Sequence, residues 1–167
     1  MKTLEHIQSY KKKIGIIHDN YASSDSAFLG ISYANKLVEL TDIEPYLFYK
    51  NLPNPVIPPA CSMMNVFDVW GFDGLTIALD LDSADALIKC VGPTRKVLYA
   101  WDLEWLRPNK KDFLQNVRIY RGIEKLVCRS DEHRNALSKY CNRDDIEVIE
   151  DFNLFEFCKR YTNFGVK

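Results

Sequence analysis

The sequence predicts a three-layer α/β/α domain with a doubly wound, mostly parallel, Rossmann-like sheet of about six strands. Two observations support this fold class. Strand-like and helix-like segments alternate along the whole chain, and the strand-like segments are continuous apolar runs, as expected of a parallel sheet covered by helices on both faces. The length of 167 residues and the 47% of hydrophobic residues fit a single domain, 1–167, with a sizeable core.

The first half of the chain is predicted to supply three strands and two helices. A polar leader occupies 1–11, the apolar run that ends at His18 is the first strand, and an amphipathic helix over 23–40 follows it. Further strands are expected at 44–50 and 75–80. The other predicted features are a proline-rich loop at 51–62, a short helix and turn at 63–74, a helix at 84–92 capped by Asp82 or Ser83, and Ser24 or Asp25 as the cap of the first helix.

The second half continues the alternation. Strands are predicted at 95–101, 124–130 and 145–153, because each is a run of apolar residues bounded by polar ones. Helices are predicted at 111–123 and 131–141, the latter with Ser130 as its N-cap. An aromatic tail over 152–167 completes the chain. Its rings either pack on the sheet or dock on a second chain: Phe152, Phe155, Phe157, Tyr161 and Phe164.

Composition excludes several classes of protein. Lys and Arg number 22 against 23 for Asp and Glu, so no strong overall field attracts nucleic acid or anionic lipid. No stretch approaches the roughly 20 apolar residues of a membrane span. The five cysteines are scattered without a CxxC pair, so we expect reduced thiols that lie mostly in the core. These features predict a cytoplasmic protein with no membrane span.

The best candidate for chemistry is His18, at the end of the first strand. The carboxyl ends of parallel strands meet at one edge of the sheet, where ligands bind in such folds. Asp19 follows His18 directly and could fix its tautomer and raise its basicity, which would make His18 a general base for an acceptor hydroxyl. Asp19 itself and Asp102 are the other candidate bases. A structural histidine that only bonds a loop remains the alternative.

Other polar and aromatic residues are expected at the same edge and are candidates for binding substrate. Trp101 and Trp105 could provide flat faces that stack on a sugar or a base, and Arg107 and Arg129 could contact phosphate. Several of the polar residues would serve equally well as helix caps. The complete set of binding candidates is Asn20, Tyr21, Ser24, Asp80, Trp101, Glu104, Trp105, Arg107, Arg129, Ser130 and Asn153.

The motifs of several common enzyme classes are absent from the sequence. There is no Walker loop, GxGxxG, GxSxG or HExxH motif, so nucleotide binding by a glycine-rich loop and the usual hydrolase and metalloprotease chemistries are not indicated. No metal site and no resident cofactor are expected. Ser23 and Ser24 could hold an anion at the start of the first helix.

The last strand-helix-strand unit, KLVCRSDEHRNALSKYCNRDDIEVIEDFNLFEF, resembles the end of the N-terminal, acceptor-side domain of GT-B fold glycosyltransferases. In the family's usual motif a proline-asparagine-glycine follows the last strand, and this chain has Glu150-Asp151-Phe152 there. The residues that fit the pattern are Ser130, His133, Leu137, Ile146, Val148, Ile149, Asn153 and Phe157.

The resemblance implies half of a GT-B fold and transfer of a sugar from a nucleotide-sugar to an acceptor hydroxyl. Members of the family use a second Rossmann-like domain for the donor, which this sequence does not contain. We therefore expect a homo-oligomer or a second subunit that supplies the donor-binding half. The acceptor stays open between a glycan, a lipid headgroup and a modified base of DNA. The alternative from another class is a non-catalytic binding or accessory subunit that keeps the acceptor-side domain.

Overall fold

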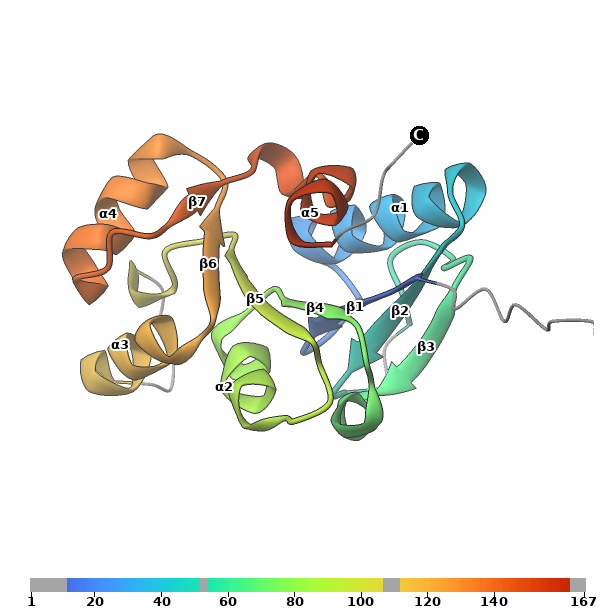
Figure 1. Ribbon diagram of the computed structural model, residues 1–167, viewed down its shortest axis with the longest axis horizontal. Helices are drawn as coiled ribbons and strands as arrows, with labels where there is room; N and C mark the ends of the chain where they lie inside the picture. The colour runs from blue at the N-terminus through green and yellow to red at the C-terminus, as the bar shows by residue number, and fades with distance from the viewer. Residues whose placement is uncertain (1–11, 52–53, 107–111, 163–167) are drawn as a thin grey trace, which may run out of the picture.

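The computed structural model describes residues 12–51, 54–106 and 112–162, which form an α/β fold around one parallel sheet (Figure 1). Every strand pair in the described residues is parallel, so helical crossovers connect most consecutive strands. The predicted fold class is therefore confirmed. The seven strands are β1 (Lys12–His18), β2 (Ile43–Tyr49), β3 (Ser62–Asn65), β4 (Leu75–Ala78), β5 (Arg95–Ala100), β6 (Lys125–Cys128) and β7 (Glu147–Val148).

Helices cover both faces of this sheet (Figure 1). One core lies under α1 and α5, and the other lies under α2, α3 and α4. The two cores are separate because successive side chains of a strand point to opposite faces, as Ile16 and Ile17 do in β1. The helices are α1 (Asp25–Leu40), α2 (Leu81–Lys89), α3 (Phe113–Gly122), α4 (Asp131–Cys141) and α5 (Leu154–Tyr161), with short 3₁₀ helices η1 (Val66–Gly71), η2 (Glu104–Leu106) and η3 (Glu150–Phe152).

The strand order β3-β2-β1-β4-β5-β6-β7 places a topological switch point between β1 and β4. The chain moves outward from β1 through β2 to β3 and then returns to pair β4 with the other side of β1. Crossovers leave the sheet in opposite directions on the two sides of this point, which opens a crevice outside the carboxyl ends of the strands. His18 ends β1, and Asp80 lies two residues after β4.

Three local predictions were wrong. Strand β3 lies within the stretch expected to be loop and short helix, because it is an edge strand with one partner and no fully buried residue. Strand β7 has two residues instead of the predicted nine, 145–153. The cap of α2 is Asp80, which accepts the Ser83 N–H, and not Asp82 or Ser83.

The aromatic tail packs back on the sheet as far as it is described. Phe152 and Phe157 are buried beside Tyr99 of β5, and the segment that follows η3 forms helix α5. Phe164 and the leader 1–11 lie outside the described residues. This packing removes the buried rings from any role in docking a second chain.

A strained turn connects β7 to α5. Asp151 and Phe152 both have left-handed backbone angles, with φ of 49° and 53°, which is unfavourable for residues that carry a Cβ. The buried Tyr99 hydroxyl stabilises the turn: it donates to the Ile149 carbonyl at 2.9 Å and accepts the Phe152 N–H at 3.1 Å. These two bonds connect the carboxyl end of β5 to the start of α5.

The five cysteines are all free thiols, as expected, and Cys61 alone among them is not fully buried. Burial raises the pKa of Cys61 and Cys128 to about 11, so both are protonated at neutral pH. Within the described residues, no helix has the length and apolar character needed to cross a membrane.

Candidate functional site

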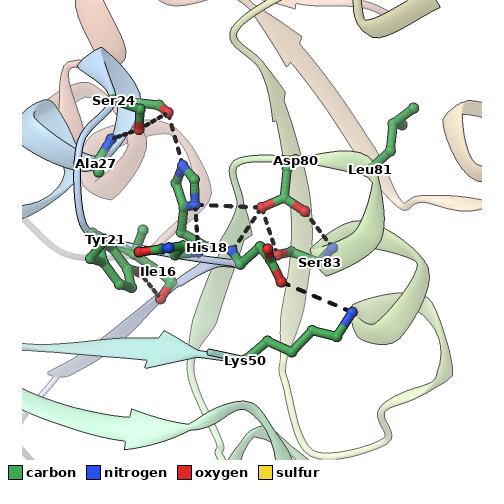
Figure 2. Close-up of polar contacts among 12 residues, drawn as sticks. Ile16, His18, Tyr21, Ser24, Ala27, Lys50, Asp80, Leu81 and Ser83 are labelled. Atoms are coloured by element: carbon green, nitrogen blue, oxygen red, sulfur yellow. Dashed lines mark hydrogen bonds and ion pairs between the residues drawn. The ribbon is translucent and has the colours of Figure 1, made fainter. Parts of the chain in front are cut away.

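The side chains of His18 and Asp80 face each other at the switch point (Figure 2), and Ser26 lies at the other ring nitrogen of His18. His18 Nε2 lies 2.8 Å from Ser26 Oγ in the first turn of α1, and His18 Nδ1 lies 3.7 Å from Asp80 Oδ2. The backbone N–H of Asn20 also points at Nδ1, at 3.2 Å. The fold therefore brings together His18, Ser26, which is 8 positions away in the sequence, and Asp80, which is 62 positions away. A hydroxyl, an imidazole and a carboxylate placed in this order form the arrangement that activates an oxygen for nucleophilic attack.

Asp80 holds this site and the start of α2 together. Its Oδ1 accepts the Ser83 N–H at 2.7 Å, and its Oδ2 accepts the Ser83 hydroxyl at 2.8 Å and the Asp19 N–H at 3.0 Å. Glu104 adds a second carboxylate, because its Oε1 accepts the Leu81 N–H at 2.9 Å. The N-terminus of α2 is thus already served by two protein carboxylates, which leaves no place there for a phosphate.

Burial sets the charge of His18. The side chain is 13% exposed, and loss of hydration lowers its pKa below the ordinary value, although the carboxylates of Asp80 and Asp19 act in the opposite direction. His18 is consequently neutral at pH 7 and has a ring nitrogen with a free electron pair. A neutral imidazole next to two carboxylates can accept a proton and then be stabilised as imidazolium.

The lowered pKa of His18 predicts a specific pH dependence of stability. In the unfolded chain histidine titrates near 6.5. Below that pH the unfolded state therefore binds more protons than the folded state, and the free energy of unfolding falls as pH falls from about 6.5 toward the lowered pKa. His18→Gln should show a shallower loss than the native chain when urea unfolding is measured from pH 7 to pH 5. Equal slopes for both proteins would contradict a buried neutral His18.

Asp19 and Asn20 shape the loop after β1. Asp19 Oδ1 accepts the Asn51 side-chain amide at 3.1 Å and lies 3.9 Å from Lys50 Nζ, so the ends of β1 and β2 are connected (Figure 2). Asn20 Oδ1 accepts the Ala22 N–H at 2.7 Å and forms a local turn. Both residues lie at the predicted edge, with Asn20 exposed and Asp19 part-buried.

The structure corrects the role predicted for Tyr21. Its side chain is 0% exposed, and its hydroxyl donates to the Ile16 carbonyl at 2.8 Å. The ring packs beside that of His18, with centroids 5.5 Å apart. A side chain with no exposed surface cannot contact a ligand, so Tyr21 packs against the His18 ring instead of binding substrate.

Trp105 also has a different place from the one predicted. Its ring stacks on Tyr140 of α4, with centroids 3.9 Å apart and planes 6° apart, and meets Tyr120 edge-on. The Tyr140 ring thus covers one face of the indole, and Trp105 is partly buried. Trp105 joins η2 to α3 and α4, and this packing holds Glu104 against α2.

Three further predicted binding residues are helix N-caps. Ser24 caps α1, Ser130 caps α4 and Asn153 caps α5, each through a side-chain oxygen that accepts a backbone N–H of the first turn. Ser24 Oγ also lies 3.1 Å from Ser26 Oγ, so it borders the His18 site. Arg107 falls outside the described residues.

A second cluster, the Arg129 cluster, consists of Trp101, Asp102, Arg129 and His133. The Arg129 guanidinium lies over the Trp101 ring, 5.5 Å from its centroid. His133 is close enough to Arg129 and Asp102 for both charges to affect its pKa, which burial and Arg129 lower. Asp102 is thus placed with His133 at the ends of β5 and β6, whereas the carboxylates that act on His18 are Asp80 and Asp19.

Sequence reasoning missed Ser26, His133 and Lys50 as members of these clusters. Ser26 is the second residue of α1. Which side chain of the first helical turn faces the end of a strand depends on how the helix packs on the sheet. His133 lies one turn into α4. In a βα unit, the residues just after the N-cap lie near the carboxyl edge, which is the sequence signal that points to both.

One open cavity of about 750 Å³ lies elsewhere, at the amino ends of β2 and β3. Its lining includes Thr41, Ile43 and Ser62. Because ligands of doubly wound sheets bind at the carboxyl edge, we assign the site to His18 and Asp80 and not to this cavity. In the described part of the chain, no group of three or more His, Cys, Asp or Glu side chains could hold a metal ion.

Asp80→Ala is expected to lower the free energy of unfolding by about 1–2 kcal/mol, because it removes the N-cap of α2 and leaves the Asp19 N–H without its acceptor. Asp73→Ala is the matched control, since Asp73 makes an exposed ion pair with Lys13. Urea unfolding of the two variants should differ clearly, with Asp73→Ala within about 0.5 kcal/mol of the native chain. Equal stabilities would show that Asp80 does not hold the site together.

No family model matches the sequence, and no curated protein matches it. The function is therefore inferred from the chemistry of the site.

Proposed function

We propose that the chain is a glycosyltransferase-like protein, the acceptor-side half or a minimal version of a GT-B enzyme, that transfers a sugar from a nucleotide-sugar to an acceptor hydroxyl. The observation that carries the proposal is the neutral, partly buried His18 at the switch point, with Ser26 at one ring nitrogen and Asp80 near the other. This is the position at which doubly wound sheets bind ligands, and a neutral imidazole is the group best suited to accept a hydroxyl proton at neutral pH.

The reaction assigns a separate task to each residue. His18 Nε2 takes the proton of the acceptor hydroxyl, which occupies the place of the Ser26 hydroxyl or lies next to it. The acceptor oxygen then bonds to the anomeric carbon, the bond from that carbon to the diphosphate breaks, and the nucleoside diphosphate leaves with the electron pair. The proton remains on His18, and Asp80 and Asp19 stabilise the imidazolium.

The tautomer of His18 connects this step to Asp80. The Asn20 N–H fits an unprotonated Nδ1, whereas Asp80 Oδ2, at 3.7 Å, fits a protonated one. When Nδ1 holds its proton toward Asp80, Nε2 is free to accept the proton of a hydroxyl. The 3.7 Å between His18 Nδ1 and Asp80 Oδ2 is longer than a hydrogen bond, and catalytic hydrogen bonds commonly shorten when substrate binds.

The donor is held by a second chain or a second copy of this one. The N-terminus of α2 is occupied by Asp80 and Glu104, so it is not a diphosphate site. The acceptor is a glycan, a lipid headgroup or a modified DNA base. The near-neutral net charge of −1 makes DNA the least favoured of the three.

The alternative function is a non-catalytic binding or accessory subunit. It is favoured by the observation that both ring nitrogens of His18 have partners within the chain, Ser26 Oγ and the Asn20 N–H, as a structural histidine would. In this case the same carboxyl edge would hold a sugar or a partner chain without proton transfer.

A panel of UDP-glucose, UDP-N-acetylglucosamine, GDP-mannose and the free nucleotides separates the two functions. Binding of a donor to the native fold raises the melting temperature in a concentration-dependent way, by an amount set by RT ln(1 + [L]/Kd). A transferase that holds the donor within this chain or across two copies of it predicts such a rise together with slow release of UDP or GDP. Absence of both effects for every donor would reject the self-sufficient enzyme and favour the accessory subunit.

A further inference from the structure

Arg129 stands apart from the other arginines of the described residues because its guanidinium has no oxygen partner there. The six others, Arg95, Arg118, Arg121, Arg134, Arg143 and Arg160, each donate to a carboxylate or a backbone carbonyl. Arg129 is exposed and contacts the Trp101 ring instead. An arginine held over an indole retains five N–H donors in its plane, in the fork geometry that matches a phosphate or a carboxylate.

The carboxylates that follow Arg129 in the sequence have other partners, and the remaining carboxylate of the Arg129 cluster, Asp102, acts on the pKa of His133. Asp131 pairs with Arg134 at 3.0 Å, and Glu132 Oε2 accepts the Ser130 hydroxyl at 3.3 Å. Stacking on Trp101 fixes the plane of the guanidinium before any ligand arrives, so little side-chain entropy is lost on binding. His133 adds a ring nitrogen, Nδ1, that is buried without a partner in the described part of the structure. These groups form a pre-ordered site for an oxyanion.

The Arg129 cluster lies on the same side of the sheet as His18. Ile16, Tyr99 and Val127 belong to one core cluster, and His18, Trp101 and Arg129 each follow one of them by two residues. Alternation along a strand therefore directs all three side chains to the face covered by α1 and α5. A single ligand that runs along this carboxyl edge could contact both places.

The distance between the two places decides which anion fits. Neighbouring strands are about 4.8 Å apart, so the end of β6 lies about 14 Å from the end of β1, and the end of β5 about 10 Å. The guanidinium leans toward Trp101, at the end of β5. In a nucleotide-sugar the nearer phosphate is joined to the reacting carbon by one oxygen, so it lies close to the base. An anion toward the end of β5 fits a group on the far side of the acceptor.

We propose that Arg129, stacked on Trp101, binds an oxyanion carried by the acceptor, a phosphate or a carboxylate, while the acceptor hydroxyl lies at His18. This inference rests on the proposed transferase function, and it assigns to the acceptor an arginine that the sequence suggested as a phosphate contact. The acceptor class is thus an anionic sugar, a sugar phosphate or a uronate, whose anion lies on the side of the ring away from the reacting hydroxyl.

The test measures binding of inorganic phosphate, glucose 6-phosphate, glucuronate, glucose and UDP to the full chain by calorimetry. Arg129→Gln should weaken binding of the preferred anionic probe by about 10-fold or more, and Arg129→Lys should recover part of it, since a charged bidentate contact is lost or reduced. Arg134→Gln is the matched control, one turn away on α4, and should stay within about 2-fold. The indole N–H signal of Trp101, one of three tryptophans, should shift on binding in the native chain.

The other results overturn either this assignment or the transferase function. Equal affinity of the native and Arg129→Gln chains for every anion, or no binding of any anion, rejects the oxyanion site. A loss confined to UDP would place the donor diphosphate there instead. If Arg129 binds the sugar phosphate but no donor is turned over, the oxyanion site stands and the transferase fails. If the Arg129→Gln chain turns donors over as fast as the native chain, the transferase stands and this assignment fails. Circular dichroism of each variant confirms that the fold is intact.

Discussion

His18→Gln lowers the rate of sugar transfer by about 10²- to 10⁴-fold while the fold stays intact, which is the range that a positioned general base contributes. Glutamine keeps a hydrogen-bonding group near Ser26 but has no basic nitrogen that can accept a proton. The loss should appear in kcat more than in KM, because the base acts in the transition state. Release of the nucleoside diphosphate in the presence of an anionic sugar acceptor measures it.

Two controls give this experiment its meaning. Ser26→Ala should retain at least about a tenth of the native rate, because an acceptor hydroxyl can take the place of the Ser26 hydroxyl beside Nε2. A collapse of the rate in Ser26→Ala equal to that in His18→Gln would instead make Ser26 the nucleophile. A His18→Gln chain with more than half of the native rate would remove His18 from the chemistry altogether.

Tyr99→Phe is expected to lower the free energy of unfolding by about 2–4 kcal/mol, because it leaves the Ile149 carbonyl and the Phe152 N–H unsatisfied inside the protein. The two left-handed residues of the turn, Asp151 and Phe152, then lose the contact that stabilises their strained backbone. Urea unfolding followed by circular dichroism measures the change.

Tyr120→Phe is the matched control for this prediction. Tyr120 is as buried as Tyr99, but its hydroxyl has no hydrogen-bond partner in the described part of the structure. Removing a buried hydroxyl that has no partner removes a desolvation cost, so Tyr120→Phe should be neutral or stabilising. Equal losses in the two variants would mean that ring packing, and not the hydrogen bonds of Tyr99, determines the effect.

The fold class could be predicted because the central strands are continuous apolar runs. Residues of β1 and β5 are buried on both faces of the sheet, and such segments differ clearly from amphipathic helices. The edge strands β3 and β7 carry no such signal, since each has one neighbour and is partly exposed. Helix α5 did have a signal, because its inward-facing residues recur at helical spacing: Leu154, Phe157, Cys158 and Tyr161.

The candidate site could be predicted in position but not in its contacts. The end of β1 marked His18 as an edge residue, and the end of β4 did the same for Asp80. Which of the neighbouring carboxylates faces the ring depends on the pairing of β1 with β4, which the sequence does not reveal. The stack of Trp105 on Tyr140 likewise depends on how α4 packs against η2. The sequence alone therefore could not show that Trp105 packs on a tyrosine whereas Trp101 lies under Arg129.

The most direct test of a ligand site at the carboxyl edge is an NMR titration of the isotopically labelled chain with the donor panel and anionic sugars. We expect chemical-shift changes at the His18 ring, the Ala22 amide and the Trp101 indole, all on one edge of the sheet. Changes confined to Thr41, Ile43 and Ser62 at the opposite edge, or no change with any of these ligands, would contradict the proposed site and with it the proposed transfer of a sugar.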